Sequence, residues 1–197
     1  SAISVAVTCG CAGIIVGVVT MTGLGLKMAN GLVALAGGSL WLTMIFTMLC
    51  SIVLGMGVPT TANYIIQATI SAPALVALGV PKLAAHMFVF YFGIVADITP
   101  PVALAAFAGS GIAGSNPMKT GFTATRLGIA AYIVPYMFVL NPILVLVNVD
   151  NLSTGLFILM AIKAIVTAFV GMVGLASGST GFFKTNCKLW AVSSTHL

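Results

Sequence analysis

Charged side chains are scarce in this sequence: of its 197 residues, seven are basic and two are acidic, so that charged residues make up 5%. A soluble domain carries roughly 25% charged residues, which cover its surface in water. Hydrophobic residues account for 60% of this chain, and its mean hydropathy is +1.23. A chain of this composition cannot cover a water-exposed surface with polar groups. We therefore predict an all-α integral membrane protein whose solvent is lipid.

The same scarcity excludes several classes of function. Two carboxylates and two histidines leave no nucleophile–base constellation, so we expect no enzyme. The basic residues are not clustered with aromatic side chains, which argues against nucleic acid as a partner. Cys9 and Cys11 form a Cys-x-Cys motif, but no histidine or second cysteine pair lies near it. We therefore expect no cofactor and no metal site of this kind.

Long apolar runs divide the chain into predicted helices. About 20 apolar residues are needed to cross a hydrocarbon core roughly 30 Å thick. Residues 114–126 are polar enough to form a loop. The chain has no basic leader and no initiator methionine, and we therefore expect it to be a piece of a longer protein. The predicted transmembrane helices are residues 1–26, 127–147 and 152–175, residues 27–39 form a connection, and residues 177–197 form a polar tail.

Residues 40–80 have the pattern of a re-entrant hairpin. The first apolar arm, residues 40–54, provides about 22 Å of helix at 1.5 Å per residue, which is short of a full crossing. It runs into the turn Gly55-Met56-Gly57-Val58-Pro59-Thr60-Thr61, and a second apolar arm follows. Two arms joined by a Gly/Pro/Thr turn indicate a segment that enters the membrane and returns on the same side. Two ordinary membrane spans are the alternative.

Residues 84–112 form an apolar segment that is interrupted by Thr99-Pro100-Pro101. Consecutive prolines remove two backbone donors, and the ring of Pro100 clashes with the preceding turn. The helix should therefore unwind near Asp97 to Thr99. Non-helical backbone at membrane depth is tolerated only against protein or a water-filled cavity. The pattern predicts a broken helix that faces a site.

The turn and the broken helix together predict a site for an ion and a solute. Broken helix ends expose carbonyls that can ligate sodium and amides that favour anions. Gly55 and Gly57 allow the backbone to come close to an ion. The side chains that supply neutral oxygens are Thr60, Thr61, Asn63 and Thr99. The competing interpretation is that glycine and proline only kink helices and that each threonine bonds to its own helix.

Three ionisable residues lie inside apolar segments. Asp97 is the one carboxylate among them, and intramembrane acids usually mark ion or proton pathways. It could ligate sodium, carry a proton or cap amides at the helix break. Lys163 could snorkel to the interface or pair with an acid. His86 could be a hydrogen-bonded histidine at the membrane interface, or it could be a ligand.

Several longer motifs resemble one family. They are Gly55-Met56-Gly57-Val58-Pro59-Thr60-Thr61-Ala62-Asn63-Tyr64, Ala84-Ala85-His86-Met87-Phe88-Val89-Phe90-Tyr91-Phe92-Gly93 and Asp97-Ile98-Thr99-Pro100-Pro101-Val102-Ala103-Leu104-Ala105-Ala106. In these motifs the chain is similar to the large membrane subunit of tripartite ATP-independent periplasmic (TRAP) transporters, in particular the variety fused to the small subunit. The resemblance runs from about residue 10 to about residue 145.

The resemblance implies one half of an inverted-repeat, elevator-type importer, a multi-pass permease subunit of the bacterial inner membrane. It implies a small carboxylate-bearing solute as substrate, a periplasmic solute-binding protein as partner, and a sodium ion or proton as coupling ion. The first half of the transporter is expected as a further, missing partner. The ion sites that it implies are Gly55, Gly57, Pro59, Thr60 and Thr61 at the hairpin tip, and Thr99, Pro100 and Pro101 at the break.

Asp97 departs from the family pattern, because other members often have a neutral residue at this place. The choice between sodium and proton coupling therefore stays open. Two hypotheses from other classes also remain. The glycine-rich stretch at residues 10–25 is compatible with a membrane scaffold that packs against partner helices without transporting anything. A passive channel is the other.

Overall fold

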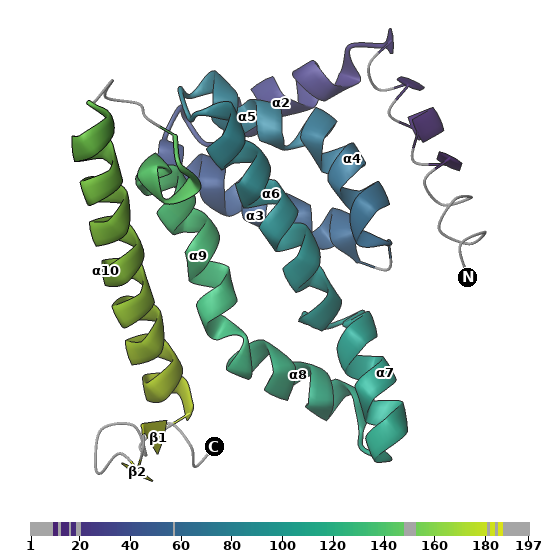
Figure 1. Ribbon diagram of the computed structural model, residues 1–197. Coiled ribbons are helices and arrows are strands. Elements are labelled where there is room, and N and C mark those ends of the chain that lie inside the picture. Colours follow the sequence, from purple (N-terminus) through teal and green to yellow (C-terminus); the bar gives the residue numbers. More distant parts are fainter. Residues whose placement is uncertain are drawn as a thin grey trace.

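The computed structural model describes residues 10–11, 13–15, 17–18, 21–56, 58–147, 153–180, 182–183 and 185–186. Apart from the two-residue strands β1 (Phe182–Phe183) and β2 (Thr185–Asn186), which pair antiparallel, the elements formed by these residues are helical (Figure 1). The prediction of a helical fold is therefore confirmed. The α-helices are α2 (Leu24–Leu35), α3 (Leu40–Gly55), α4 (Thr60–Ile70), α5 (Ala72–Ala77), α6 (Lys82–Val95), α7 (Leu104–Ala113), α8 (Pro117–Leu127), α9 (Ile129–Leu140) and α10 (Thr154–Thr180).

Helix α6 is the centre of the packing. It contacts α3, α4 and α5 on one side and α9 on the other (Figure 1). Its small and aromatic residues recur at helical spacing and form a buried face. Phe88 and Phe92 are fully buried on that face, with ring centroids 4.9 Å apart, and both contact the ring of Tyr136 on α9. This aromatic cluster joins α6 to α9.

Helices α3 and α4 form the two arms of a hairpin. Gln67 of α4 donates from Nε2 to the backbone oxygen of Ser51 on α3, at 3.0 Å. One turn farther from the tip, the Oγ of Ser71 lies 3.7 Å from the Sγ of Cys50. From the first pair to the second, the residue number rises on α4 and falls on α3. Helices α3 and α4 are therefore antiparallel. The predicted segment 40–80 continues through α5, which packs beside α6.

The helix that begins at Lys82 breaks where its prolines lie. Helix α6 ends at Val95, a short 3-10 helix covers Ala96–Ile98, and α7 begins only at Leu104. Residues 99–103 are therefore outside any helix. Ala103 has a positive φ of 29°, which marks an irregular entry into α7.

The sequence suggested a loop at residues 114–126, but these residues contain helix α8. Asn116 caps it by accepting a hydrogen bond from the Lys119 backbone N–H at 3.1 Å, and Pro117 is its first residue. Asn followed by Pro is a helix-start signal, which the low hydropathy of the segment had obscured. Helix α8 meets α9 at a bend of 43°.

The N-terminal boundary also differs from the sequence prediction. The expected helix over residues 1–26 is interrupted at Gly23, which has a φ of 65°, a conformation that glycine adopts without strain. Helix α2 then occupies Leu24–Leu35, where a connection was expected. At the other end, α10 continues to Thr180 and so includes the first residues of the expected polar tail.

Among the described residues, one helix is long and apolar enough to cross a bilayer by itself, at Thr154–Gly178 within α10. Helices α8 and α9 meet the same criterion only as a bent pair. Helices α3 and α7 are apolar but shorter, with 16 and 10 residues. Helix α10 packs against α8, α9 and the 3-10 helix Pro142–Val145 along one edge (Figure 1).

We expect the substitution Phe88→Ala to destabilise the protein strongly, because Phe88 is 0% exposed at the centre of the aromatic cluster. Removing a buried phenylalanine costs about 3–5 kcal/mol. Thermal unfolding of the purified protein in detergent measures the loss. Phe90→Ala is the matched control on the same helix, because Phe90 is 36% exposed. Equal losses for the two variants would contradict the central position of α6.

Candidate functional site

The hairpin tip joins a helix C-terminus to a helix N-terminus. Helix α3 ends at Gly55, and Met56 is extended, with φ −64° and ψ 113°. Pro59 precedes α4, and the first backbone bond of α4 runs from the Asn63 N–H to the Pro59 oxygen at 3.0 Å. The amides of the first turn precede that bond, so they lack intrahelical partners. Thr60 and Thr61 are exposed at this end.

The helix break, like the hairpin tip, joins a helix C-terminus to a helix N-terminus. The C-terminus of α6 and the N-terminus of α7 are joined by residues 99–103, which lie outside any helix and are closed by one bond from the Ala103 N–H to the Thr99 oxygen, at 3.2 Å. The Thr99 Oγ1 donates to the Val95 oxygen at 2.6 Å, which satisfies one carbonyl in the last turn of α6. Asp97 is half-buried in the 3-10 helix. Carbonyl ends carry partial negative charge and amide ends partial positive charge.

The tip and the break are in direct contact. A Cβ added at Gly55 would lie 2.7 Å from the Cβ of Ala96 and 2.7 Å from the Nδ2 of Asn63. A Cβ added at Gly93, near the end of α6, would lie 2.6 Å from the same Nδ2. Glycine at both positions is therefore what lets α3, α4 and α6 approach so closely. The arrangement brings two interrupted helices together around the Asn63 amide.

The Asn63 side chain is held by its neighbour on α4. Its Oδ1 accepts from Gln67 Nε2 at 2.6 Å, and both side chains are buried, with 1% and 0% exposure. Its Nδ2 has no hydrogen-bond partner among the described residues. This donor lies beside Gly55 and Gly93, and Gly55 in turn lies against Ala96 of the break. An amide fixed in this way can bind an acceptor that enters between the two elements.

The rear of the break is supported by α8 and α9. The Thr99 Oγ1 also bonds to the Tyr132 hydroxyl on α9, at 2.6 Å. The Thr125 Oγ1 of α8 donates to the Ile98 oxygen at 2.9 Å. A Cβ at Gly121 would lie 3.3 Å from the Cγ of Pro100, so α8 packs closely on the proline pair. The unwound backbone is thus held on the side opposite the hairpin.

The structure brings some of the predicted residues together and separates others. Gly55 and Asn63 contact the break, whereas the Thr99 side chain is directed to α9 and Pro100 to α8. Pro59, Thr60, Thr61 and Pro101 are exposed, and Asp97 is half-buried. Gly57 lies outside the described residues.

Sequence reasoning missed residues that complete this arrangement. Gln67, Gly93 and Tyr132 hold or border the site, but none was singled out. Part of the signal was present, because buried polar or small residues repeat every four positions on both arms. These positions are Thr43, Thr47, Ser51 and Gly55 on α3, and Asn63, Gln67 and Ser71 on α4.

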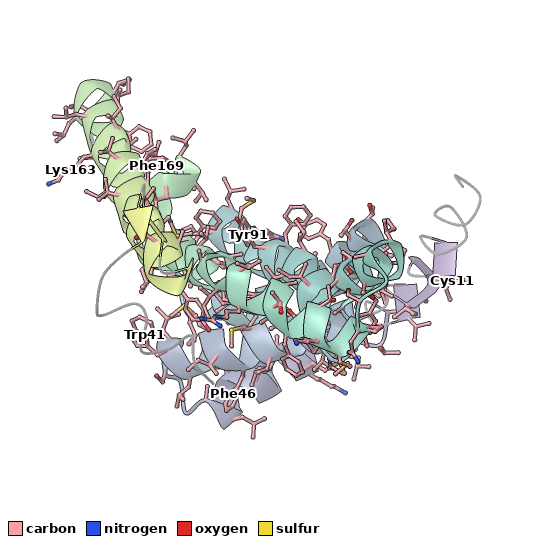
Figure 2. All side chains as sticks on the ribbon, turned by 90° about the horizontal axis from the view of Figure 1, so that it is seen from below. Cys11, Trp41, Phe46, Tyr91, Lys163 and Phe169 are labelled. Atoms are coloured by element: carbon pink, nitrogen blue, oxygen red, sulfur yellow. The ribbon has the colours of Figure 1, made fainter. Side chains whose placement is uncertain are left out.

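Two ionisable residues of open role lie away from this site. The Nδ1 of His86 is 3.1 Å from the hydroxyl of Tyr64, so it joins α6 to α4 by a hydrogen bond. Lys163 is exposed on α10 (Figure 2), where it lines a pocket together with Asn141 and Ile143, which follow α9. Neither residue contributes to the contact between the tip and the break.

Comparison with known families decides the class of protein. The family model of the tripartite ATP-independent periplasmic transporter, DctM component, matches residues 1–152, which include the hairpin and the broken helix. The chain belongs to this family. No curated protein and no solved structure matches the chain. The resemblance inferred from the motifs is therefore confirmed, and this DctM-family chain is part of an integral membrane transporter component rather than a member of an enzyme family. Helix α10 begins at Thr154, after the matched residues.

We expect Gly55→Ala to disrupt the contact between the tip and the break, because its Cβ would lie 2.7 Å from Ala96 and Asn63. Overpacking of this kind costs roughly 1–3 kcal/mol. The thermal unfolding midpoint in detergent should fall. Gly111→Ala in α7 is the control, because nothing lies within 4 Å of its Cβ, and it should leave stability unchanged or slightly raised. A Gly55→Ala variant as stable as Gly111→Ala would show that the contact is looser than described.

The bond between Thr99 and Tyr132 predicts energetic coupling of the break to α9. Thr99→Val and Tyr132→Phe each remove one partner of the 2.6 Å hydrogen bond. Their effects on the free energy of unfolding should be non-additive, with a coupling of about 0.5–3 kcal/mol for residues in contact. A double-mutant cycle of thermal or denaturant unfolding measures it. Additive effects would mean that the two hydroxyls do not interact.

Proposed function

We propose that this chain is part of a secondary active transporter that couples uptake of a small carboxylate-bearing solute to a sodium ion or a proton. The observation that supports this is the direct contact between the hairpin tip and the helix break, at Gly55, Asn63, Gly93 and Ala96. The family membership supports transport as the general activity. In transporters, paired helix interruptions at membrane depth are where ions and substrates bind.

The chemistry of the two interruptions favours an ion and an anionic solute together. The ends of α3 and α6 present carbonyl oxygens, which suit a monovalent cation. The N-termini of α4 and α7 present amides, which favour a carboxylate. Asp97 lies beside these ends and would either ligate the cation or carry the coupled proton. A cation and an anion bound next to each other neutralise one another, which makes their joint burial less costly than that of either alone.

The topology that accompanies this function is part of the same proposal. We take the α3–α4 hairpin as re-entrant, because α3 has 16 residues and both arms are antiparallel. The chain would form the later half of an inverted-repeat, elevator-type permease, multi-pass in a bacterial inner membrane. Solute would be delivered by a periplasmic binding protein, which fits the tripartite, periplasmic character of this transporter family. Bilayer lipid and the first half of the transporter would be the other partners.

Uptake by the full-length protein tests the proposal. Reconstituted in liposomes with its binding protein, it should accumulate solute against a gradient when sodium or a proton gradient is supplied. Dissipating the coupling gradient should abolish accumulation. Uptake that is indifferent to both gradients would contradict ion coupling. Downhill flux alone would identify a passive channel.

Two substitutions distinguish transport from a scaffold function. Thr60→Ala and Thr99→Ala remove hydroxyls at the tip and at the break. A transporter should lose uptake while still assembling in the membrane, whereas a scaffold should assemble and function normally. Thr123→Ala is the control, because this threonine is exposed on α8 and its hydroxyl donates to the Lys119 oxygen of its own helix, at 2.8 Å. Normal uptake by both site variants would exclude these hydroxyls from the mechanism.

A further inference from the structure

Two hydroxyls inside the hairpin differ from several other hydroxyls in the described helices. Thr69, Thr123, Thr167 and Ser110 bond to a backbone oxygen of their own helix, which is the usual way to satisfy such a group. Thr47 and Ser51 make no such bond, although both are 0% exposed. Their oxygens have no hydrogen-bond partner among the described residues.

The facing arm supplies a third oxygen in the same condition. Gln67 uses its Nε2 for two bonds, to the Ser51 backbone oxygen at 3.0 Å and to Asn63 Oδ1 at 2.6 Å. Its Oε1 has no partner among the described residues, and the side chain is 0% exposed. Thr47 and Ser51 are one turn apart on one face of α3, and the Gln67 amide is anchored against Ser51. Two hydroxyl donors and one amide acceptor therefore belong to one buried stretch between the arms.

Buried polar groups are nearly always hydrogen-bonded, if not to protein then to ordered water. We propose that these three side chains form an internal water site between α3 and α4. A water molecule can accept from the Thr47 and Ser51 hydroxyls and donate to Gln67 Oε1, which gives it the usual three bonds. It would bridge the two arms below the tip and hold Gln67, which in turn fixes Asn63.

Water fits this site better than a monovalent cation. Neither α3 nor α4 contains an acidic residue that would balance a buried positive charge. The Gln67 Nε2 amide, a donor, is also part of the cluster. Burying an unbalanced ion is far more costly than immobilising one neutral water. The water site lies in the hairpin interior and does not depend on the proposed transport activity.

High-resolution cryo-electron microscopy of the full-length protein tests the site directly. Maps recorded in sodium buffer and in choline buffer should both show one density within hydrogen-bond distance of Thr47 Oγ1, Ser51 Oγ and Gln67 Oε1. A density that disappears without sodium would identify a cation and overturn the proposal. The proposal also fails if no density is present and the two hydroxyls bond to carbonyls of α3.

A pair of matched variants gives an independent test whose sign is decisive. Thr47→Val removes a hydroxyl that the proposal assigns to the water, so the thermal unfolding midpoint should fall. If that hydroxyl is instead unsatisfied, its removal should raise the midpoint, because a buried unpaired polar group is lost. Thr43→Val is the control: Thr43 is equally buried on α3, and the Ser39 oxygen that accepts its hydroxyl keeps the Thr43 backbone N–H at 3.0 Å. A midpoint that rises, or that falls no more than in the control, would overturn the proposal.

Discussion

Backbone amides and carbonyls inside a membrane must find partners within the protein, and this requirement organises the structure around α6. The helical backbone is interrupted twice, between α3 and α4 at the tip and between α6 and α7 at the prolines. Four helix ends must therefore be packed against protein. The two interruptions are packed against each other, with Gly55 next to Ala96, so each is covered by protein. The close approach depends on Gly55 and Gly93, where a side chain would collide with Asn63. The candidate site is thus a consequence of how the broken ends are accommodated.

The hairpin arms show the same constraint in their side chains. On α3 the inward face carries Thr43, Thr47 and Ser51, all fully buried, whereas the outward face carries Leu49 and Val53, which are 51% and 60% exposed. This is the reverse of a helix in water, where polar residues face out. It fits an arm whose outer side meets lipid or other apolar protein. The polar interior links the arms by hydrogen bonds that an apolar seam could not provide.

The sequence predicted the interruptions but not what holds them. Gly55, Pro59, Pro100 and Pro101 act locally through backbone chemistry, so their effect can be read without a structure. The support of the break comes from Tyr132, 33 residues away, and from α8, which looked like a loop because it is polar. Contacts of this kind depend on packing that no local pattern specifies. Gln67 was missed as well, although its four-residue spacing from Asn63 is visible in the sequence.

These contacts also constrain how the site can move. A binding site between two elements keeps its geometry only if both elements move together. Gly55 against Ala96 joins the hairpin to the break, and the ring cluster of Phe88, Phe92 and Tyr136 joins α6 to α9. A displacement of the hairpin alone would separate Gly55 from Ala96 and Asn63 from Gly93. Under the proposed transport function, the hairpin, α6 and the break would therefore move as one body, and any large motion would be taken up at the borders of that body.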